Sequence, residues 1–261
     1  MRFALILSYN GAPFNGWQIQ PSDPAVQQSL ERALSLALRH NTAIVGAGRT
    51  DTGVNARYMV AHFDVPHQIG ESLDTTDGQS KLIRTVNAIV RPAIAVYHCV
   101  KVSDDFHARF DALSRTYRYF IHTVPDPFRH DSSRFIHQKL DFGRMNHEAQ
   151  DLLGTQDFTS FSKLHTDTKN NICTITEAKW VEYGPEHYYF EISANRFLRN
   201  MVRAIVGTLL DVGTGKATPG HVVNVINKLD RCSAGTSVPG YALYLWDIKY
   251  SITLPDAKVE I

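Results

Sequence analysis

The sequence has few cysteines, no long apolar run and almost no net charge. Only three cysteines occur in 261 residues, Cys99, Cys173 and Cys232, and they form no CxxC pair. This spacing argues against a disulfide framework or a zinc site and favours a reducing, cytoplasmic compartment. No segment approaches the ~20 consecutive apolar residues of a membrane span. The run FALIL near the N-terminus is too short for the core of a signal peptide.

The composition is that of an ordinary globular protein. Hydrophobic residues make up 43% of the chain and charged residues 20%, and the formal net charge is +1. This balance neither favours nor excludes a nucleic-acid partner. If RNA is the partner, the basic residues must be concentrated on one face.

The order of apolar patterns in the first half predicts a β-α-β-β-α-β arrangement. Alternating or continuous apolar runs indicate strands, and apolar residues at helical spacing indicate helices. The predicted elements cover residues 2–9, 25–39, 42–46, 58–65, 80–90 and 93–102.

The second half repeats this order. Its predicted strands and helices cover residues 115–122, 142–153, 172–183, 187–194, a helix from about residue 197, a short helix at 221–229 and a strand at 242–250. We therefore predict an α+β protein of two ferredoxin-like split-βαβ halves, similar to RNA-recognition motifs, with antiparallel sheets. The domains would be residues 1–105 and 106–261, with an active-site cleft between them. One irregular α+β domain is the alternative.

A glycine-rich stretch, GAGRTDTGVNA at residues 46–56, is the first candidate site. A dinucleotide-binding fingerprint would need glycine where Asp51 stands, and a Walker A loop would need lysine where Val54 stands. Both phosphate-binding interpretations therefore fail. Arg49 and Asp51 are candidates for chemistry, although an aspartate here can also simply complete a turn.

A second candidate is the basic segment RFLRNMVRAIVGTLLDVG at residues 196–213. Asn195 can cap a helix that begins there. On such a helix, Arg196, Arg199 and Arg203 share one face, which suits phosphate groups but can also be a solvated basic face.

A third candidate is the segment FHARFDALSRTYRYF at residues 106–120, where basic and aromatic residues alternate. In a strand, Tyr117 and Tyr119 share one face, and we expect Tyr119 to belong to the core. Aromatic faces beside arginines are also used to stack unpaired RNA bases. No metal motif stands out, since His62 and His67 lie on a strand and a turn without a clustered acid.

These segments together resemble the tRNA pseudouridine synthase A family. The resemblance rests on GRTDTGVNA, RTYRYF and FLRNMVRAIVGTLLDVGTGK, and it extends from LSYNGAPFNGWQIQP through DDFHARF and DFTSFSK to ALYLWDIKY. It thus covers nearly the whole chain in the expected order.

The resemblance implies that uridine is isomerised to pseudouridine at positions 38–40 of the tRNA anticodon arm, by a homodimer without metal or organic cofactor. It implies that Asp51 is the nucleophile or stabilises the ribosyl cation, and that Arg203 pairs with it. Tyr117 would pack on the uracil and help remove the C5 proton. Arg49 would fill the space left by the flipped base or hold the neighbouring backbone, and Leu243 would close the apolar side of the pocket.

Three positions depart from the usual family pattern. Asn10 stands where aspartate is common, Asn55 where histidine is common, and Ala242 where glycine is common. Two other functions stay open from the residues: an RNA-binding protein without catalysis, and a nucleoside hydrolase. The hydrolase would need a second positioned carboxylate, for which Asp104 and Asp105 are the nearest pair.

Overall fold

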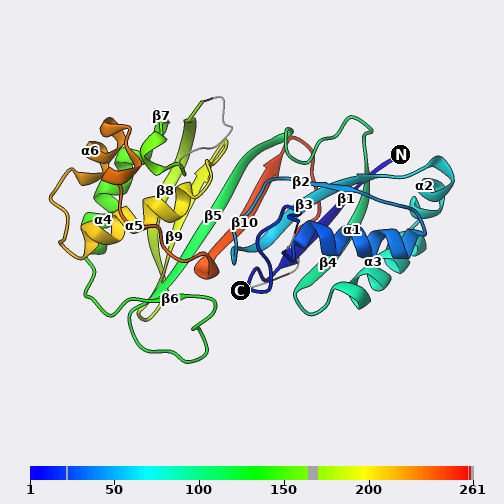
Figure 1. Ribbon diagram of the computed structural model, residues 1–261, viewed down its shortest axis with the longest axis horizontal. Helices are drawn as coiled ribbons and strands as arrows, with labels where there is room; N and C mark the ends of the chain where they lie inside the picture. Colours follow the sequence, from blue (N-terminus) through cyan, green and yellow to red (C-terminus); the bar gives the residue numbers. More distant parts are fainter. Residues whose placement is uncertain (22, 164–169, 258, 260–261) are drawn as a thin grey trace. The chain divides into compact units, whose positions relative to one another are not determined.

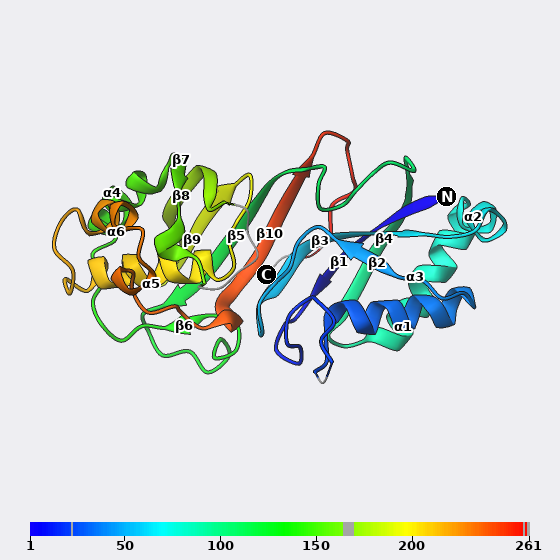
Figure 2. The same cartoon turned by 45° about the horizontal axis from the view of Figure 1, so that its top comes forward.

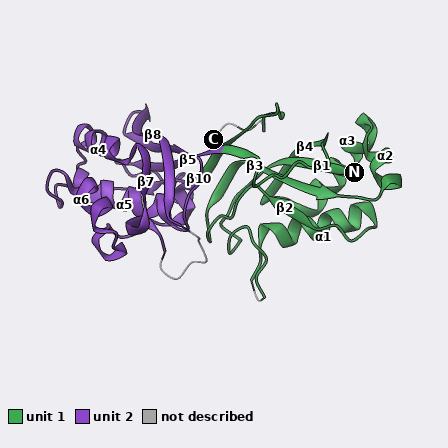
Figure 3. Ribbon diagram, turned by 90° about the horizontal axis from the view of Figure 1, so that it is seen from above, with its two compact units in different colours: residues 1–113, 245–261 green, residues 114–244 purple. Residues whose placement is uncertain are grey.

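The computed structural model describes residues 1–21, 23–163, 170–257 and 259. The chain divides into two compact units (Figure 3): unit 1 is Met1–Leu113 with Leu245–Ile261, and unit 2 is Ser114–Tyr244. Both units mix helices with mostly antiparallel strands, which confirms the predicted α+β class. Residues 106–113 and 245–257 belong to unit 1, beyond the predicted limit at residue 105.

The sheet of unit 1 is built on a central apolar strand (Figure 1). β1 (Arg2–Tyr9) lies between β4 (Ile94–Val102) and β3 (Asn55–Asp64) and pairs antiparallel with both. Its residues 3–7 are fully buried, as the continuous apolar sequence predicts. The short strand β2 (Ile44–Gly46) pairs with β3, and residues 245–250 of β10 (Leu243–Tyr250) follow β3 in the strand order.

Two long helices cover this sheet (Figure 1). α1 (Val26–Leu38) buries Val26, Leu30 and Leu34, which confirms the predicted helical stripe. α3 (Thr76–Val90) contacts both α1 and β4. Its N-cap is Thr75, whose hydroxyl accepts a hydrogen bond from the amide of Gly78 at 3.0 Å. A short helix, α2 (His67–Leu73), was not predicted because its seven residues carry little periodic signal.

In unit 2 (Figure 2), four strands form an antiparallel sheet in the order β5-β9-β8-β7. Their bounds are β5 (Ala112–His122), β7 (Gly154–Asp157), β8 (Ile172–Gly184) and β9 (His187–Ala194). The β8–β9 hairpin turns at Gly184-Pro185, between the predicted strands 172–183 and 187–194. A two-residue strand, β6 (Arg134–Phe135), runs parallel to the end of β5.

Three helices of unit 2 contact one another (Figure 2): α4 (Phe142–Ala149), α5 (Met201–Gly213) and α6 (His221–Lys228). A 3₁₀ turn at Gln150–Leu152 continues α4 to nearly its predicted end. Two further 3₁₀ turns, Arg231–Ser233 and Gly240–Ala242, precede β10.

The predicted start of α5 is wrong. The helix begins at Met201, and its N-cap is Asn200 rather than Asn195. Asn200 has a φ of 66°, in the left-handed region, so the helix cannot extend back through it. Asn195 instead prolongs strand pairing: its amide donates to the carbonyl of Thr174 at 3.1 Å, and its side chain accepts from the Thr174 amide at 2.9 Å.

Unit 1 also contains a buried histidine. His62 on β3 is 4% exposed, and its Nδ1 accepts a hydrogen bond from the amide of Ala108 at 3.1 Å. Burial, helped by the nearby charges of Arg2 and His107, lowers the pKa of His62 to about 4 against the opposing effect of Asp64 and Asp111. The folded protein therefore holds this imidazole neutral at pH 7.

We expect His62 to make the protein less stable as the pH falls from 6.5 towards 4. The unfolded chain takes up the proton near pH 6.5, whereas the folded chain does so only near pH 4. Between pH 7 and pH 5 the free energy of unfolding should fall by about 1–2 kcal/mol through this residue. Urea unfolding of His62→Gln should lack this part of the fall. The exposed His67→Gln is the control, and an equal pH dependence in wild type and His62→Gln would refute the expectation.

Candidate functional site

The Asp51 loop connects β2 and β3 of unit 1. Asp51 is half-buried, and its carbonyl accepts from the amide of Val54 at 3.1 Å, which closes a tight turn. Gly53 in that turn has a φ of 73°. The amide of Ala47 donates to the carbonyl of Val60 at 2.8 Å and ties the start of the loop to β3. The loop therefore begins and ends on the central sheet of unit 1.

Residues 9–17 hold the loop on both sides of Asp51. The hydroxyls of Tyr9 and Thr50 lie 2.9 Å apart, and the amide of Trp17 donates to the carbonyl of Thr50 at 3.3 Å. On the other side, the amide of Gly53 donates to the carbonyl of Phe14 at 3.3 Å. These three contacts hold the backbone immediately before and after Asp51.

A close backbone contact explains one glycine of this segment. Gly16 has a φ of 88°, and a Cβ added there would lie 2.3 Å from the carbonyl oxygen of Thr50. Any other residue at position 16 would have to displace the backbone immediately before Asp51. The segment FNGWQ, residues 14–18, therefore supports the loop that carries Asp51.

Asn55 supports the loop in the same way. It is 3% exposed, and its Oδ1 accepts from the amide of Gly11 at 2.7 Å. Where the family pattern commonly has histidine, this chain thus uses an amide oxygen to hold the neighbouring segment. Asn10, the second departure, is exposed, and its Oδ1 accepts from the amide of Ala12 at 2.8 Å within a local turn.

Arg49 extends from the same loop. Its side chain is exposed, and among the described residues it makes no hydrogen bond or ion pair. A Cβ at the neighbouring Gly48 would meet no atom within 4 Å, so there is open space beside Arg49. The guanidinium is therefore available to a ligand such as a phosphate or a base.

Tyr117 lies on β5 of unit 2, opposite Ile192 of β9. It is half-buried, and its ring meets the ring of Phe197 edge-on, with 5.1 Å between centroids and an interplanar angle of 87°. Tyr119, two residues further on the same face, is fully buried, which confirms its predicted place in the core. Burial raises the pKa of Tyr119 above its usual range, so it stays neutral.

Arg203 lies in the first turn of α5. Its Nε donates to the carbonyl of Val238 at 2.7 Å, and the amide of Val238 donates back to the carbonyl of Arg203 at 3.1 Å. The side chain is half-buried. This reciprocal pair ties the Nε of Arg203 to the backbone of Val238 within unit 2.

Arg196 and Arg199 are not on a helix with Arg203, contrary to the prediction. Both precede α5, because the helix starts only at Met201. Arg196 is half-buried and lies 3.4 Å from the side-chain oxygen of Asn170, whereas Arg199 is exposed. Leu243, the first residue of β10, is 5% exposed.

Two further properties concern cofactors and membranes. Within residues 1–21, 23–163, 170–257 and 259, no group of three or more His, Cys, Asp or Glu side chains is placed to hold a metal ion. In the same ranges, no helix is both long and apolar enough to span a bilayer.

Comparison with known proteins defines the class. A profile of the family described as tRNA pseudouridine synthase matches residues 149–251. The chain is 51% identical to tRNA pseudouridine synthase A of Parabacteroides distasonis, over 95% of this chain and 96% of that protein. It is 48% identical to the enzyme of Bacteroides fragilis, over 95% and 96%, and 39% identical to that of Bacillus subtilis, over 96% and 99%.

The chain therefore belongs to the tRNA pseudouridine synthase A family, whose members are isomerases that convert uridine to pseudouridine in tRNA. Several supporting residues were not assigned a role from the sequence, namely Tyr9, Gly16, Trp17 and Val238. The first three lie in LSYNGAPFNGWQIQP, which carried the resemblance. Their contacts with Thr50 and Arg203 depend on backbone geometry and leave no local pattern.

Proposed function

We propose that the chain isomerises uridine to pseudouridine at positions 38–40 of the tRNA anticodon arm. The observation that carries this proposal is the 51% identity to a tRNA pseudouridine synthase A over 95% of the chain. The Asp51 loop supports the proposal, because the family resemblance assigns the reacting carboxylate to Asp51 and this loop is held on both sides of that residue.

The chemistry explains the residues that we assign to it. The N1–C1′ bond breaks, a C5–C1′ bond forms, and the proton on C5 is replaced by one on N1, so that no atom is added and no electron is transferred. The Asp51 carboxylate captures or stabilises the ribosyl cation at C1′, in the manner of a glycosidase carboxylate. The target uridine must leave its stack to reach it, at a cost of a few kcal/mol.

The remaining residues bind or orient in this proposal. Tyr117 packs on the uracil and removes the C5 proton, and Arg203 keeps the Asp51 carboxylate ionised and aimed. Arg49 holds the backbone or fills the space of the flipped base. Leu243 provides an apolar wall.

We also propose a domain organisation, an oligomeric state and a cellular compartment for the protein. The chain would consist of two ferredoxin-like halves, and its domains would be residues 1–105 and 106–261, as the sequence predicts. The protein would act as a cytoplasmic homodimer without a metal or organic cofactor. Two subunits would present more basic surface to one tRNA than a single chain with a net charge of +1.

Tritium release tests the reaction. A tRNA transcript that carries C5-tritiated uridine should lose its tritium to water when incubated with the protein, and nuclease digestion should yield pseudouridine. A protein that only binds RNA would release no tritium, and a hydrolase would release labelled uracil. Either outcome would refute the isomerase proposal.

We expect Arg196→Ala and Arg199→Ala to weaken tRNA binding and to reduce its salt dependence. If each side chain contacts one phosphate, the slope of log K against log salt should decrease by about one in each variant. Filter binding at several salt concentrations measures the slope. Arg84→Ala, an exposed arginine on α3, is the control. Slopes equal to wild type would mean that these arginines are a solvated face.

A further inference from the structure

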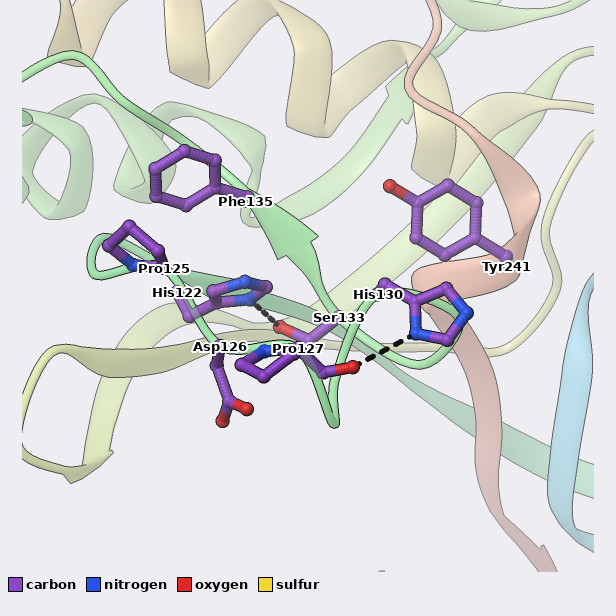
Figure 4. A pocket seen from close by; sticks show the side chains of 8 residues that line it. All are labelled: His122, Pro125, Asp126, Pro127, His130, Ser133, Phe135 and Tyr241. Atoms are coloured by element: carbon purple, nitrogen blue, oxygen red, sulfur yellow. Dashed lines mark hydrogen bonds between the residues drawn. The ribbon is translucent and has the colours of Figure 1, made fainter.

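A pocket of about 400 Å³ lies in unit 2, apart from the residues assigned so far (Figure 4). Its volume is in the range of small-molecule sites. The residues that matter to its chemistry are His122, Asp126, His130, Ser133, Phe135 and Tyr241. They come from the end of β5, the following loop, β6 and the 3₁₀ turn before β10.

Hydrogen bonds and ring packing hold the inner wall of the pocket. His122 is 2% exposed, and its Nδ1 lies 2.9 Å from the hydroxyl of Ser133, which is also buried. The His122 and Phe135 rings lie 5.5 Å apart at 31°, and β6 is anchored beside them because the amide of Ile136 donates to the carbonyl of His122. Phe135 nevertheless remains 45% exposed. The wall therefore presents an aromatic face to solvent.

The charges of the pocket favour a neutral ligand over an anion. Among the described residues that line it, there is no lysine or arginine. Its one carboxylate, Asp126, accepts from the amide of Phe128 at 2.9 Å and pairs with Arg129 at 3.2 Å. Burial lowers the pKa of His122, so this imidazole is neutral at pH 7. A phosphate in the pocket would meet the Asp126 carboxylate, and no lysine or arginine of the described chain lines the wall to bind it.

The polar edges of the pocket suit a nucleobase. His130 is exposed, and its Nδ1 lies 3.2 Å from the carbonyl of Pro127, which requires the proton on Nδ1 and leaves Nε2 to form a hydrogen bond with a ligand. Tyr241 presents its hydroxyl on the side of the pocket that faces Phe135 (Figure 4). Hydrogen-bonding edges around an exposed aromatic face are the features with which proteins recognise unpaired RNA bases.

The pocket is near the residues that we assign to the uridine. Tyr241 precedes Leu243 by two residues, so their Cα atoms lie within about 8 Å. His122 follows Tyr117 by five residues on β5, a distance of about 17 Å along the strand. Nucleotides close to the target uridine in the same RNA strand can span both distances.

We propose that this pocket binds the base of an unpaired nucleotide of the tRNA close to the target uridine. The proposal rests on the proposed function, since it assumes that unit 2 carries tRNA. Phe135 stacks on the base, His130 and Tyr241 bind its edge, and the nucleotide sets which uridine reaches Asp51.

The test compares Phe135→Ala, Phe135→Tyr and a control, Phe128→Ala, in full-length protein. Phe128 is 91% exposed in the same loop and does not line the pocket. We expect Phe135→Ala to raise the tRNA Kd by about 5- to 150-fold, the usual effect of one base–aromatic stack, with kcat changed by less than about threefold. Phe135→Tyr keeps the ring and should bind like wild type, as should Phe128→Ala. Equal melting temperatures check that all variants fold.

A second measurement identifies the nucleotide. Each unpaired nucleotide of the anticodon loop is replaced in turn by an abasic one, and its effect is measured with wild type and with Phe135→Ala. At one position of the anticodon loop, the effects of the abasic nucleotide and of Phe135→Ala on the tRNA binding free energy should not add, because both changes remove the same contact. Additive effects at every position, a wild-type Kd for Phe135→Ala, or an equal loss in Phe128→Ala would overturn the proposal. If wild type releases no tritium, the proposed function fails. If wild type releases tritium but Phe135→Ala binds tRNA as tightly as wild type does, the pocket proposal alone is refuted.

Discussion

Replacing Asp51 by asparagine should abolish turnover and leave tRNA affinity within a few-fold of wild type. The amide keeps the size of the carboxylate but can neither attack nor stabilise a cation at C1′. Removal of such a group costs several kcal/mol in the transition state, so we expect tritium release to fall at least about a hundredfold. The loop should keep its shape, because the contacts of Thr50 and Gly53 with residues 9–17 do not use the Asp51 side chain.

Asp104→Asn provides the matched control, since Asp104 belongs to the carboxylate pair that a hydrolase would need. Its side chain is 82% exposed, and we expect full activity. An Asp51→Asn enzyme that keeps more than about a hundredth of wild-type activity would count against a catalytic Asp51. A loss in Asp104→Asn as large as that in Asp51→Asn would favour hydrolysis with two carboxylates.

Tyr117→Phe should lower turnover by about 10²–10⁴-fold, the usual contribution of a general acid–base group, if its hydroxyl handles the C5 proton. We favour this role because stacking alone needs no hydroxyl. If Tyr117 only stacks, the phenylalanine should retain activity within about tenfold, and Tyr117→Leu should lose ~1–3 kcal/mol of binding. Single-turnover tritium release separates the two roles from effects on product release.

Tyr119→Phe is the control for a tyrosine on the same strand face. Tyr119 is fully buried, so its substitution should act on stability and leave single-turnover rates of the folded protein near wild type. A folded and fully active Tyr117→Leu enzyme would contradict both roles of Tyr117. The half-buried ring of Tyr117 would then serve only its edge-on contact with Phe197.

Much of the fold could be predicted because its elements have strong local signals. The continuous apolar run of β1 and the apolar stripe of α1 predict the ends of these elements to within one residue of those observed. The β8–β9 hairpin is likewise marked by a Gly-Pro turn. The start of α5 could not be predicted, because its sequence allows helix from Arg196. The left-handed Asn200 and the pairing of Asn195 with Thr174 exclude it.

The sequence by itself determined the α+β class, the catalytic candidates and the family, because these depend on residue identity and order along the chain. Only the tertiary structure decided how Asp51 is held, since the hydroxyl of Tyr9, the backbone of Trp17 and the close backbone approach at Gly16 lie more than thirty residues away in the chain. It also separated Arg203 from Arg196 and Arg199, and it brought His122, Phe135 and Tyr241 to one pocket. Such contacts join residues that are distant in sequence, and no local period or propensity encodes them.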